Sequence, residues 1–304
     1  MHGGPYWVFM LRLSRLGYDP EVPSPHAQDL AFAIDVARRA GELLTRSYER
    51  AMRVDRKSKR DVVTDVDYAS EALVIEAIRD RYPGDAILAE ESGRHERSDG
   101  GKPAVGATRT QWSRRTWVID PLDGTVNYAN GIPFFCVSIG LIEAGRPVVG
   151  VIVDPLRGDC YAAAADGRTT LNGEPVWSTM KEELGDFVVS MAIIGRGGIA
   201  RERRVAPEIR ISRRMGSAAL ALAYVASGRF DAFVQNGGLS LWDITAAGLV
   251  AERAGATVTD LYGGPWWNVT KRAPRLSIVA APQPHHGRLL ELLRAARTTV
   301  QTRR

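Results

Sequence analysis

The segment that decides the fold is Trp117-Val118-Ile119-Asp120-Pro121-Leu122-Asp123-Gly124-Thr125. It begins as a short apolar run, typical of a buried strand, and ends in two carboxylates, a glycine and a hydroxyl. Carboxylate oxygens are the ligands that Mg2+ prefers, so the strand end predicts a catalytic centre that handles phosphate. The residues alone also allow a surface turn, because Asp-Pro starts turns and Asp-Gly continues them.

Two further acidic positions favour the catalytic interpretation. Glu90-Glu91-Ser92 follows the apolar run 86–89, and Trp242-Asp243 opens an apolar, alanine-rich helix. A carboxylate at the border of an apolar element is costly to bury without a cation or a hydrogen-bond donor. We therefore expect the three acidic positions to form one metal cage.

Four motifs of the chain resemble those of the inositol monophosphatase family. In chain order they are Asp61-Val62-Val63-Thr64-Asp65-Val66-Asp67, Glu90-Glu91-Ser92, Asp120-Pro121-Leu122-Asp123-Gly124-Thr125 with Asn127-Tyr128, and Trp242-Asp243-Ile244-Thr245-Ala246-Ala247-Gly248. Their number and order make a chance match an unsatisfactory explanation. The resemblance extends over nearly all of the chain after residue 25.

The resemblance implies a fold, a cofactor and an assembly. The fold would be α+β, a five-layered α-β-α-β-α sandwich of the inositol monophosphatase/fructose-1,6-bisphosphatase type, and the protein would be a homodimer with two to three Mg2+ ions per subunit. The metal ligands implied are Glu90, Asp120, Asp123, Asp243 and the carbonyl of Leu122, with Asp67 at a weaker third ion.

The resemblance also assigns catalytic roles. Thr125 would orient the attacking water, with Glu90 or Asp67 as its acid–base partner. Two cations a few Å apart would lower the pKa of a bound water and neutralise the leaving oxygen. An N-cap of a helix is the alternative role for Thr125, and the two roles are compatible.

Substrate contacts are implied less directly. The amides of Gly124 and Thr125 would cradle the phosphate at a helix start, helped by the turn Gly216-Ser217-Ala218, and Asp243 would also contact the substrate. Lys57 would steer the anion, with a solvated charge run as the alternative. Gln235 stands where inositol-hydrolysing members place an acidic residue, if Asn236-Gly237-Gly238 contains one extra residue.

We therefore expect a Mg2+-dependent phosphomonoesterase for small alcohol phosphates, with inositol 1-phosphate as the first choice. Because Gln235 departs from the acidic pattern, a histidinol-phosphatase, a fructose-1,6-bisphosphatase and a 3'(2'),5'-bisphosphate nucleotidase remain alternatives. From a different class, a non-catalytic regulatory or RNA-binding protein also remains.

Composition agrees with a globular enzyme. The 304 residues can bury a large core, and no apolar run approaches the ~20 residues that span a bilayer, so we expect no membrane partner. Two cysteines, Cys136 and Cys160, lie in apolar runs, which favours a reducing cytoplasm over a disulfide framework. The net charge of +5 comes from arginines spread without aromatic interleaving, so nucleic acid is not an expected partner.

Periodicity and turn residues divide the chain into an expected order of elements. Helices are expected at 27–48, 68–81, 218–226, 242–254 and 286–296, and strands at 86–89, 116–119, 134–143, 148–154, 159–164, 187–194, 209–213, 230–234, 257–260 and 277–281. Residues 1–25 are expected to be a disordered N-terminal extension, 26–168 an α+β subdomain with the metal site, and 169–304 an α/β subdomain. Residues 92–115 are expected to form a mobile loop beside the site.

Overall fold

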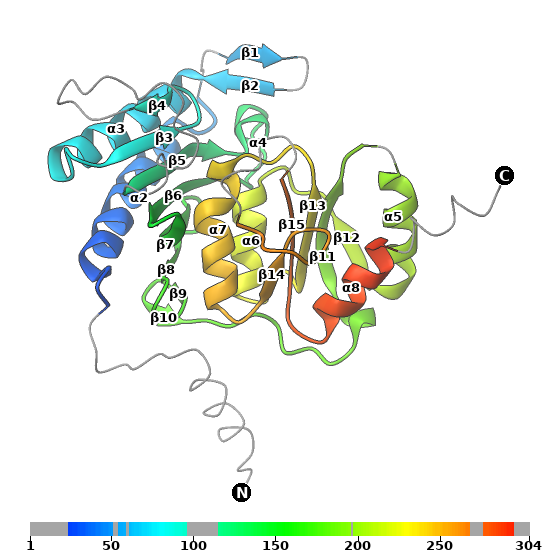
Figure 1. Ribbon diagram of the computed structural model, residues 1–304. Coiled ribbons are helices and arrows are strands. Elements are labelled where there is room, and N and C mark those ends of the chain that lie inside the picture. The colour runs from blue at the N-terminus through cyan, green and yellow to red at the C-terminus, as the bar shows by residue number, and fades with distance from the viewer. Residues whose placement is uncertain are drawn as a thin grey trace, which may run out of the picture.

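A computed structural model describes residues 24–50, 54–58, 61–95, 115–195, 197–267 and 276–294. Two sheets and three layers of helices alternate through the molecule, as Figure 1 shows. No helix among these residues is both long and apolar enough to cross a membrane. Both cysteines are buried and free, as expected.

The first sheet has eight strands, in the order β10-β9-β8-β7-β6-β5-β3-β4. They are β3 (Ala86–Ala89), β4 (Gly93–His95), β5 (Thr116–Asp123), β6 (Cys136–Glu143), β7 (Arg146–Asp154), β8 (Asp159–Ala164), β9 (Thr170–Leu171) and β10 (Glu174–Pro175). Neighbours are antiparallel except β3 and β5, which are parallel. The parallel pair brings the carboxyl ends of β3 and β5 to the same edge of the sheet.

The alternation of side chains along these strands produces two cores. Val137, Ile139 and Leu141 of β6 face α2 (Ala27–Ser47) and α3 (Asp65–Arg81). Cys136 of the same strand faces α6 (Ala218–Ala226) and α7 (Leu241–Arg253). A strand with both faces buried reads as the continuous apolar run that the sequence shows.

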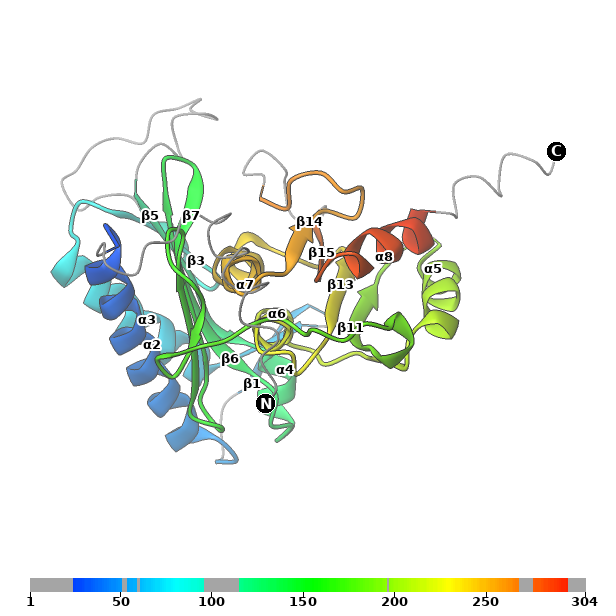
Figure 2. The ribbon, with the colours of Figure 1, turned by 90° about the horizontal axis from the view of Figure 1, so that it is seen from below.

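The second sheet has five strands, in the order β12-β11-β13-β15-β14. They are β11 (Val188–Ile193), β12 (Ile211–Arg213), β13 (Ala232–Asn236), β14 (Thr257–Thr259) and β15 (Ser277–Ala281). Helices α6 and α7 cover one face, and α5 (Gly198–Val205) and α8 (His285–Arg294) cover the other. Figure 2 shows the resulting order α2/α3, sheet, α6/α7, sheet, α5/α8. The expected five-layered sandwich is confirmed.

Smaller elements complete the chain. The hairpin β1 (Val54–Ser58) and β2 (Asp61–Thr64) precedes α3, and α4 (Thr125–Ala129) follows β5. Two short 3-10 helices are η3 (Leu184–Asp186) and η4 (Ala206–Glu208). Strands β9 and β10 carry the first sheet to Pro175, and the division into subdomains at residue 168 stays a prediction.

Several expected boundaries are corrected by the structure. Helix α3 begins three residues before 68, because Thr64 caps it. Strand β5 continues four residues beyond 119, since an irregular register at Asp120–Asp123 accommodates Pro121. Gly93–His95 forms a strand inside the region expected to be a loop. The predictions for residues 1–23 and 96–114 lie outside the described residues.

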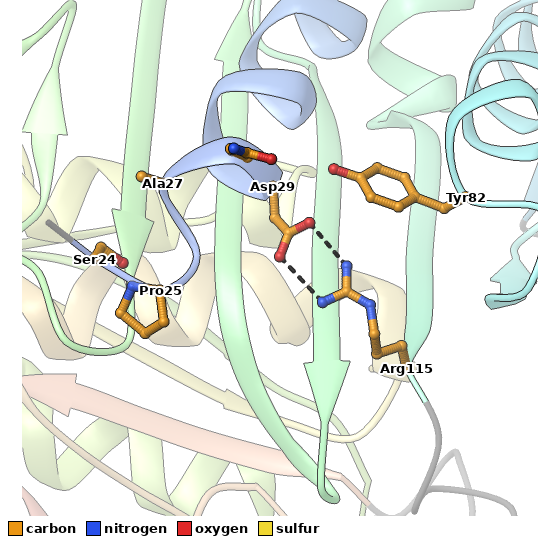
Figure 3. A pocket seen from close by; sticks show the side chains of 7 residues that line it. Ser24, Pro25, Ala27, Asp29, Tyr82 and Arg115 are labelled. Carbon is orange, nitrogen blue, oxygen red and sulfur yellow. Dashed lines mark hydrogen bonds and ion pairs between the residues drawn. The ribbon is translucent and has the colours of Figure 1, made fainter.

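Arg115, directly before β5, forms ion pairs with two other segments of the chain (Figure 3). Its guanidinium donates to the two carboxylate oxygens of Asp29 at 2.8 and 3.1 Å and to Asp85 at 3.1 Å. An open cavity of about 480 Å³ lies beside this group and is also lined by Tyr82 and Ser24. Because the acidic residues lie at the other end of β5, this cavity is separate from the expected catalytic centre.

Two glycines let α7 approach the first sheet closely. Gly140 of β6 and Gly150 of β7 are paired across the sheet. A Cβ on Gly140 would lie 2.6 Å from Cγ2 of Thr245, and one on Gly150 would lie 2.6 Å from the carbonyl oxygen of Ala246. The backbone of α7 therefore packs directly against the two glycines, and this contact sets the distance of Asp243 from the strands of the first sheet.

We expect Gly150→Ala to lower the free energy of unfolding by about 1–3 kcal/mol, as overpacking typically does. The added methyl group meets backbone atoms of α7 that cannot rotate away. Urea denaturation measures the change. Gly185→Ala is the matched control, because nothing lies within 4 Å of its added Cβ. Equal stability of the two variants would contradict the role assigned to the glycine pair.

Candidate active site

The end of β5 carries the first two carboxylates. Val118 and Ile142 form a cluster against which Leu241 and Trp242 of α7 pack, so Asp120, two positions after Val118, also faces α7. In a regular strand Asp123 would face the opposite side, because it is an odd number of residues away. The register irregularity between Asp120 and Asp123 corrects this, and both carboxylates reach the same volume.

Helix α7 supplies the third carboxylate. Oxygen atoms of Asp120, Asp123 and Asp243 all lie within 4.8 Å of one another. The backbone N–H of Ser240 donates to Oδ2 of Asp243 at 2.6 Å, which orients the side chain at the helix start. Within the described part of the chain, this is the one group of three or more His, Cys, Asp or Glu side chains that could hold a metal ion.

Burial, together with the neighbouring negative charges, raises the pKa of each carboxyl group. Burial raises the pKa of Asp120 well above its ordinary value, and the charges of Glu90, Asp123 and Asp243 add to the effect. Burial raises the pKa of Asp123 to about 6, although hydrogen bonds from Ser217 and Ala219 oppose the shift. The pKa of Asp243 is likewise raised by burial and by Asp123.

These observations fit a divalent cation. Buried carboxylates are stable when ionised only if a positive charge or several donors compensate them. Asp120 is 1% exposed, and among the described residues no ion pair joins it to a basic side chain. An oxygen-only cluster suits Mg2+, which prefers carboxylates, carbonyls and water.

Asp67 and Thr125 form a second group beside the first. The Thr125 hydroxyl lies 3.0 Å from Oδ1 of Asp67 and 3.0 Å from the carbonyl oxygen of Leu122. Oδ2 of Asp67 accepts from the backbone N–H and the hydroxyl of Thr64. Burial raises the pKa of Asp67, the bonds from Thr64 and Thr125 oppose this, and the charge of Glu90 adds a smaller increase.

The alternative role of Thr125 as a helix N-cap is wrong. Gly124 is the N-cap of α4, with a left-handed φ of 102°, and Thr125 is the first helical residue. Its hydroxyl points to Asp67 and Leu122 instead of capping the helix. Thr125 and Asp67 are therefore joined by a direct hydrogen bond, while their catalytic roles stay predictions.

Helix α6 reaches the carboxylates from the layer between the sheets. Ser217 caps α6 by accepting from the backbone N–H of Leu220, and its hydroxyl donates to Oδ2 of Asp123 at 2.6 Å. The backbone N–H of Ala219 donates to the same oxygen at 2.6 Å. Ala218 begins the helix between these two residues. The turn expected to bind phosphate thus contacts a predicted metal ligand.

The remaining expected residues lie at three other elements. Glu90 directly follows β3, its N–H donates to the carbonyl of Ile119, and its charge acts on all three aspartates. Gln235 lies in β13, with Nε2 3.4 Å from the carbonyl oxygen of Gly237. Lys57 lies in β1, and its side chain is outside the described part of the structure.

The sequence interpretation missed the residues that hold these side chains in place. Thr64 with Asp67, and Ser240 with Asp243, are two capping boxes in which the acidic residue is the third residue of its helix. The spacing Ser/Thr-x-x-acid before an apolar helix was the available signal. The motif that contains Asn127 gives no sign of its role: its amide donates to the carbonyls of Phe134 and Met215 and joins α4 to the turn before α6.

Comparison with known proteins agrees with this geometry. The model of the inositol monophosphatase family matches residues 26–300. A protein named "Nus factor SuhB" from Pasteurella multocida is 37% identical over 248 residues, which are 77% of this chain and 86% of that protein. An "Inositol monophosphatase" from Mesembryanthemum crystallinum is 32% identical over 250 residues, covering 79% of this chain and 87% of its own.

Solved structures show the same fold. The extragenic suppressor protein suhB from Bartonella henselae has a TM-score of 0.78 and 30% sequence identity, over 88% of this chain and 98% of its own. Inositol monophosphatase from Anabaena (Nostoc) has a TM-score of 0.73 and 33% identity, over 89% of this chain and 96% of its own.

We expect Mg2+ to raise the melting temperature more at pH 8 than at pH 5. Without metal, the raised pKa of Asp123, about 6, means that stability is lost as the pH rises through that value. A cation relieves this loss where the carboxylates are ionised and competes with protons where they are not. At about 100 times its Kd it should add about 2.7 kcal/mol, or roughly 5 °C.

Differential scanning calorimetry with EDTA or with Mg2+ measures the effect. A shift of the same size at both pH values would show that the cation binds elsewhere. Asp35→Asn is the control, since Asp35 is an exposed residue of α2 whose ion-pair partner in the described part of the chain is Arg39.

Proposed function

The chain belongs to the inositol monophosphatase family and is a phosphomonoesterase, and we propose that it hydrolyses small alcohol phosphates with bound Mg2+, inositol 1-phosphate first among them. Two to three ions per subunit, a homodimer and a cytoplasmic location are part of the proposal. The observation that carries it is the cluster of Asp120, Asp123 and Asp243 within 4.8 Å, next to the bonded pair Thr125 and Asp67.

The proposed metal ligands are Asp120, Asp123, Asp243, Glu90 and the Leu122 carbonyl, with Asp67 at a further ion. When bound, Mg2+ supplies the positive charge that offsets the phosphate and lowers the pKa of a bound water. The carbonyl oxygen of Leu122 lies 3.0 Å from the Thr125 hydroxyl. One proposed metal ligand is therefore adjacent to the hydroxyl that is proposed to orient the water.

Thr125 and Asp67 are the proposed proton-handling pair. The hydroxyl can donate to Asp67 and accept from a water molecule at the same time. Asp67 holds the hydroxyl through Oδ1 while Thr64 fixes Oδ2, so the acceptor cannot rotate away. Burial raises the pKa of Asp67, which makes it a better proton acceptor than an exposed aspartate. Glu90 remains the alternative acid–base partner.

The proposed phosphate contacts are the amides of Gly124 and Thr125 and the turn at Ser217 and Ala218, with Lys57 steering the anion. Gln235 and Asp243 would contact the alcohol. The function is tested by phosphate release from inositol 1-phosphate, glycerol 2-phosphate, histidinol phosphate, fructose 1,6-bisphosphate and adenosine 3',5'-bisphosphate, with Mg2+ and with EDTA. Undiminished hydrolysis in EDTA, or release from none of these esters, would contradict the proposal.

Asp120→Asn is expected to lower kcat by at least ~10^3, because the cluster loses electrostatic stabilisation worth several kcal/mol. The amide is almost the same size as the carboxylate, so the fold should be retained, and circular dichroism checks this. Asp35→Asn should keep full activity. A variant Asp120→Asn with activity within tenfold of the wild type would remove Asp120 from the proposed ligand set.

Thr125→Ala is expected to lower kcat by roughly 10^2 with little change in KM, which is typical of lost acid–base assistance. Thr125→Ser keeps the hydroxyl and should recover most of the rate. If both variants retain the wild-type kcat and only the melting temperature falls, the hydroxyl has a structural role alone.

Gln235→Glu is expected to raise selectivity for inositol 1-phosphate over glycerol 2-phosphate by about tenfold, or ~1.4 kcal/mol. A carboxylate accepts from two adjacent hydroxyl groups more strongly than a neutral amide does. The measurement is the ratio of kcat/KM for the two esters. An unchanged ratio would show that residue 235 does not contact the alcohol.

A second candidate is a regulatory role in complex with another macromolecule. It is favoured by the relatives named "Nus factor SuhB" and by exposed arginines around α5 and β12. Two of these, Arg210 and Arg214, are paired with Asp186 and Glu202. RNA binding that survives physiological salt and is lost when Arg203 and Arg213 become Gln would support this role.

A further inference from the structure

An exposed isoleucine lies at the carboxyl end of β11. Strands β11 and β13 are parallel, and Ile193 is paired with Asn236, so both strands end at the same edge of the second sheet. Ile194 follows directly, and its N–H donates to the carbonyl of Asn236 at 3.0 Å. Ile194 is 50% exposed, whereas Val189, Met191 and Ile193 of the strand are buried.

The alternation along β11 tells which way this side chain points. Met191 and Ile193 belong to the core under α5 and α8, so Ala192 faces the opposite side, toward α6 and α7. Ile194 is two positions after Ala192 and faces the same way. Gln235 is the register partner of Ala192 and shares this face, whereas Asn236 is directed toward α5 and α8.

A contact places Ile194 against the segment that leads to Asp243. Its Cδ1 atom lies 3.2 Å from the position of a Cβ on Gly238. Gly238 is two residues before Ser240, whose N–H holds Oδ2 of Asp243 at 2.6 Å. At ~3.6 Å per residue at most, the two-residue step from Gly238 to Ser240 spans no more than about 7 Å, so Ile194 flanks the segment that positions Asp243.

We propose that Ile194 is a specificity-determining residue that contacts the alcohol part of the substrate. The class it selects is a phosphate monoester whose alcohol carries an apolar or aromatic ring. This inference rests on the proposed phosphatase function and extends it. The ring would cover the exposed aliphatic surface, while the neighbouring amide of Gln235 offers one donor and one acceptor to a polar substituent.

The test compares benzyl phosphate with glycerol 2-phosphate in the full-length protein with Mg2+. Ile194→Ser should raise KM for benzyl phosphate about fivefold and leave its kcat unchanged, because a smaller polar side chain offers less apolar contact area. KM for glycerol 2-phosphate should stay within about twofold, since glycerol has no ring to lose contact. Ile194→Leu should restore the wild-type KM.

Ile211→Ser is the matched control. Ile211 is also an exposed isoleucine of the second sheet, but it pairs with Val188 at the amino end of β11, away from the three aspartates. The variant Ile211→Ser should change KM neither for benzyl phosphate nor for glycerol 2-phosphate. Equal KM changes for both esters in Ile194→Ser, or no change for either, would overturn the inference while the phosphatase function stands. Failure of the wild type to hydrolyse either ester would overturn both.

Discussion

Repulsion among Asp120, Asp123 and Asp243 is the constraint on which the rest of this structure depends. Three carboxylates that share a buried volume oppose the approach of α7 to the first sheet: burial raises the pKa of each, and neighbouring negative charges add to the shift. The free energy gained by packing α7 between the two sheets must therefore exceed this electrostatic repulsion. Helix α7 lies between the two sheets, with buried side chains on most of its faces, and the glycine pair removes the steric barrier to contact.

Backbone donors orient three of the acidic side chains. Oδ2 of Asp67 accepts from the N–H of Thr64, Oδ2 of Asp243 from that of Ser240, and Oδ2 of Asp123 from that of Ala219. The amino ends of three helices supply these contacts. A helix start favours a negative charge, so each contact also offsets part of the repulsion. The predicted metal ligands are therefore oriented by the protein's own hydrogen bonds.

The sequence predicts the layers and the acidic residues because both leave strong local signals. Buried strands such as β6 and β8 are continuous apolar runs, and the acidic residues interrupt such runs at their ends. The register irregularity after Asp120 leaves no such signal, since Pro121 is equally compatible with a turn. The closeness of Gly140 and Gly150 to α7 is also invisible, because it depends on a helix about a hundred residues away.

The position of Gln235 shows what tertiary structure adds. From the sequence, Gln235 stands in the position of the family's acidic residue if Asn236-Gly237-Gly238 contains one extra residue. The register of β13 with β11 adds that Gln235 shares a face of the sheet with Ala192, and that Asn236 lies on the opposite face. Only pairing between strands more than 40 residues apart supplies that information.

The bond between Ser217 and Asp123 makes the two sheets a single cooperative unit. Asp123 belongs to the first sheet, while Ser217 caps a helix that packs against both sheets. Local opening of α6 would strip two donors from a buried carboxylate and so could not occur without disturbing the acidic cluster. By thermodynamic reciprocity, a cation that binds the cluster better when α6 is in place must also hold α6 in place. Occupancy of the site and the integrity of the middle layer are thus one equilibrium.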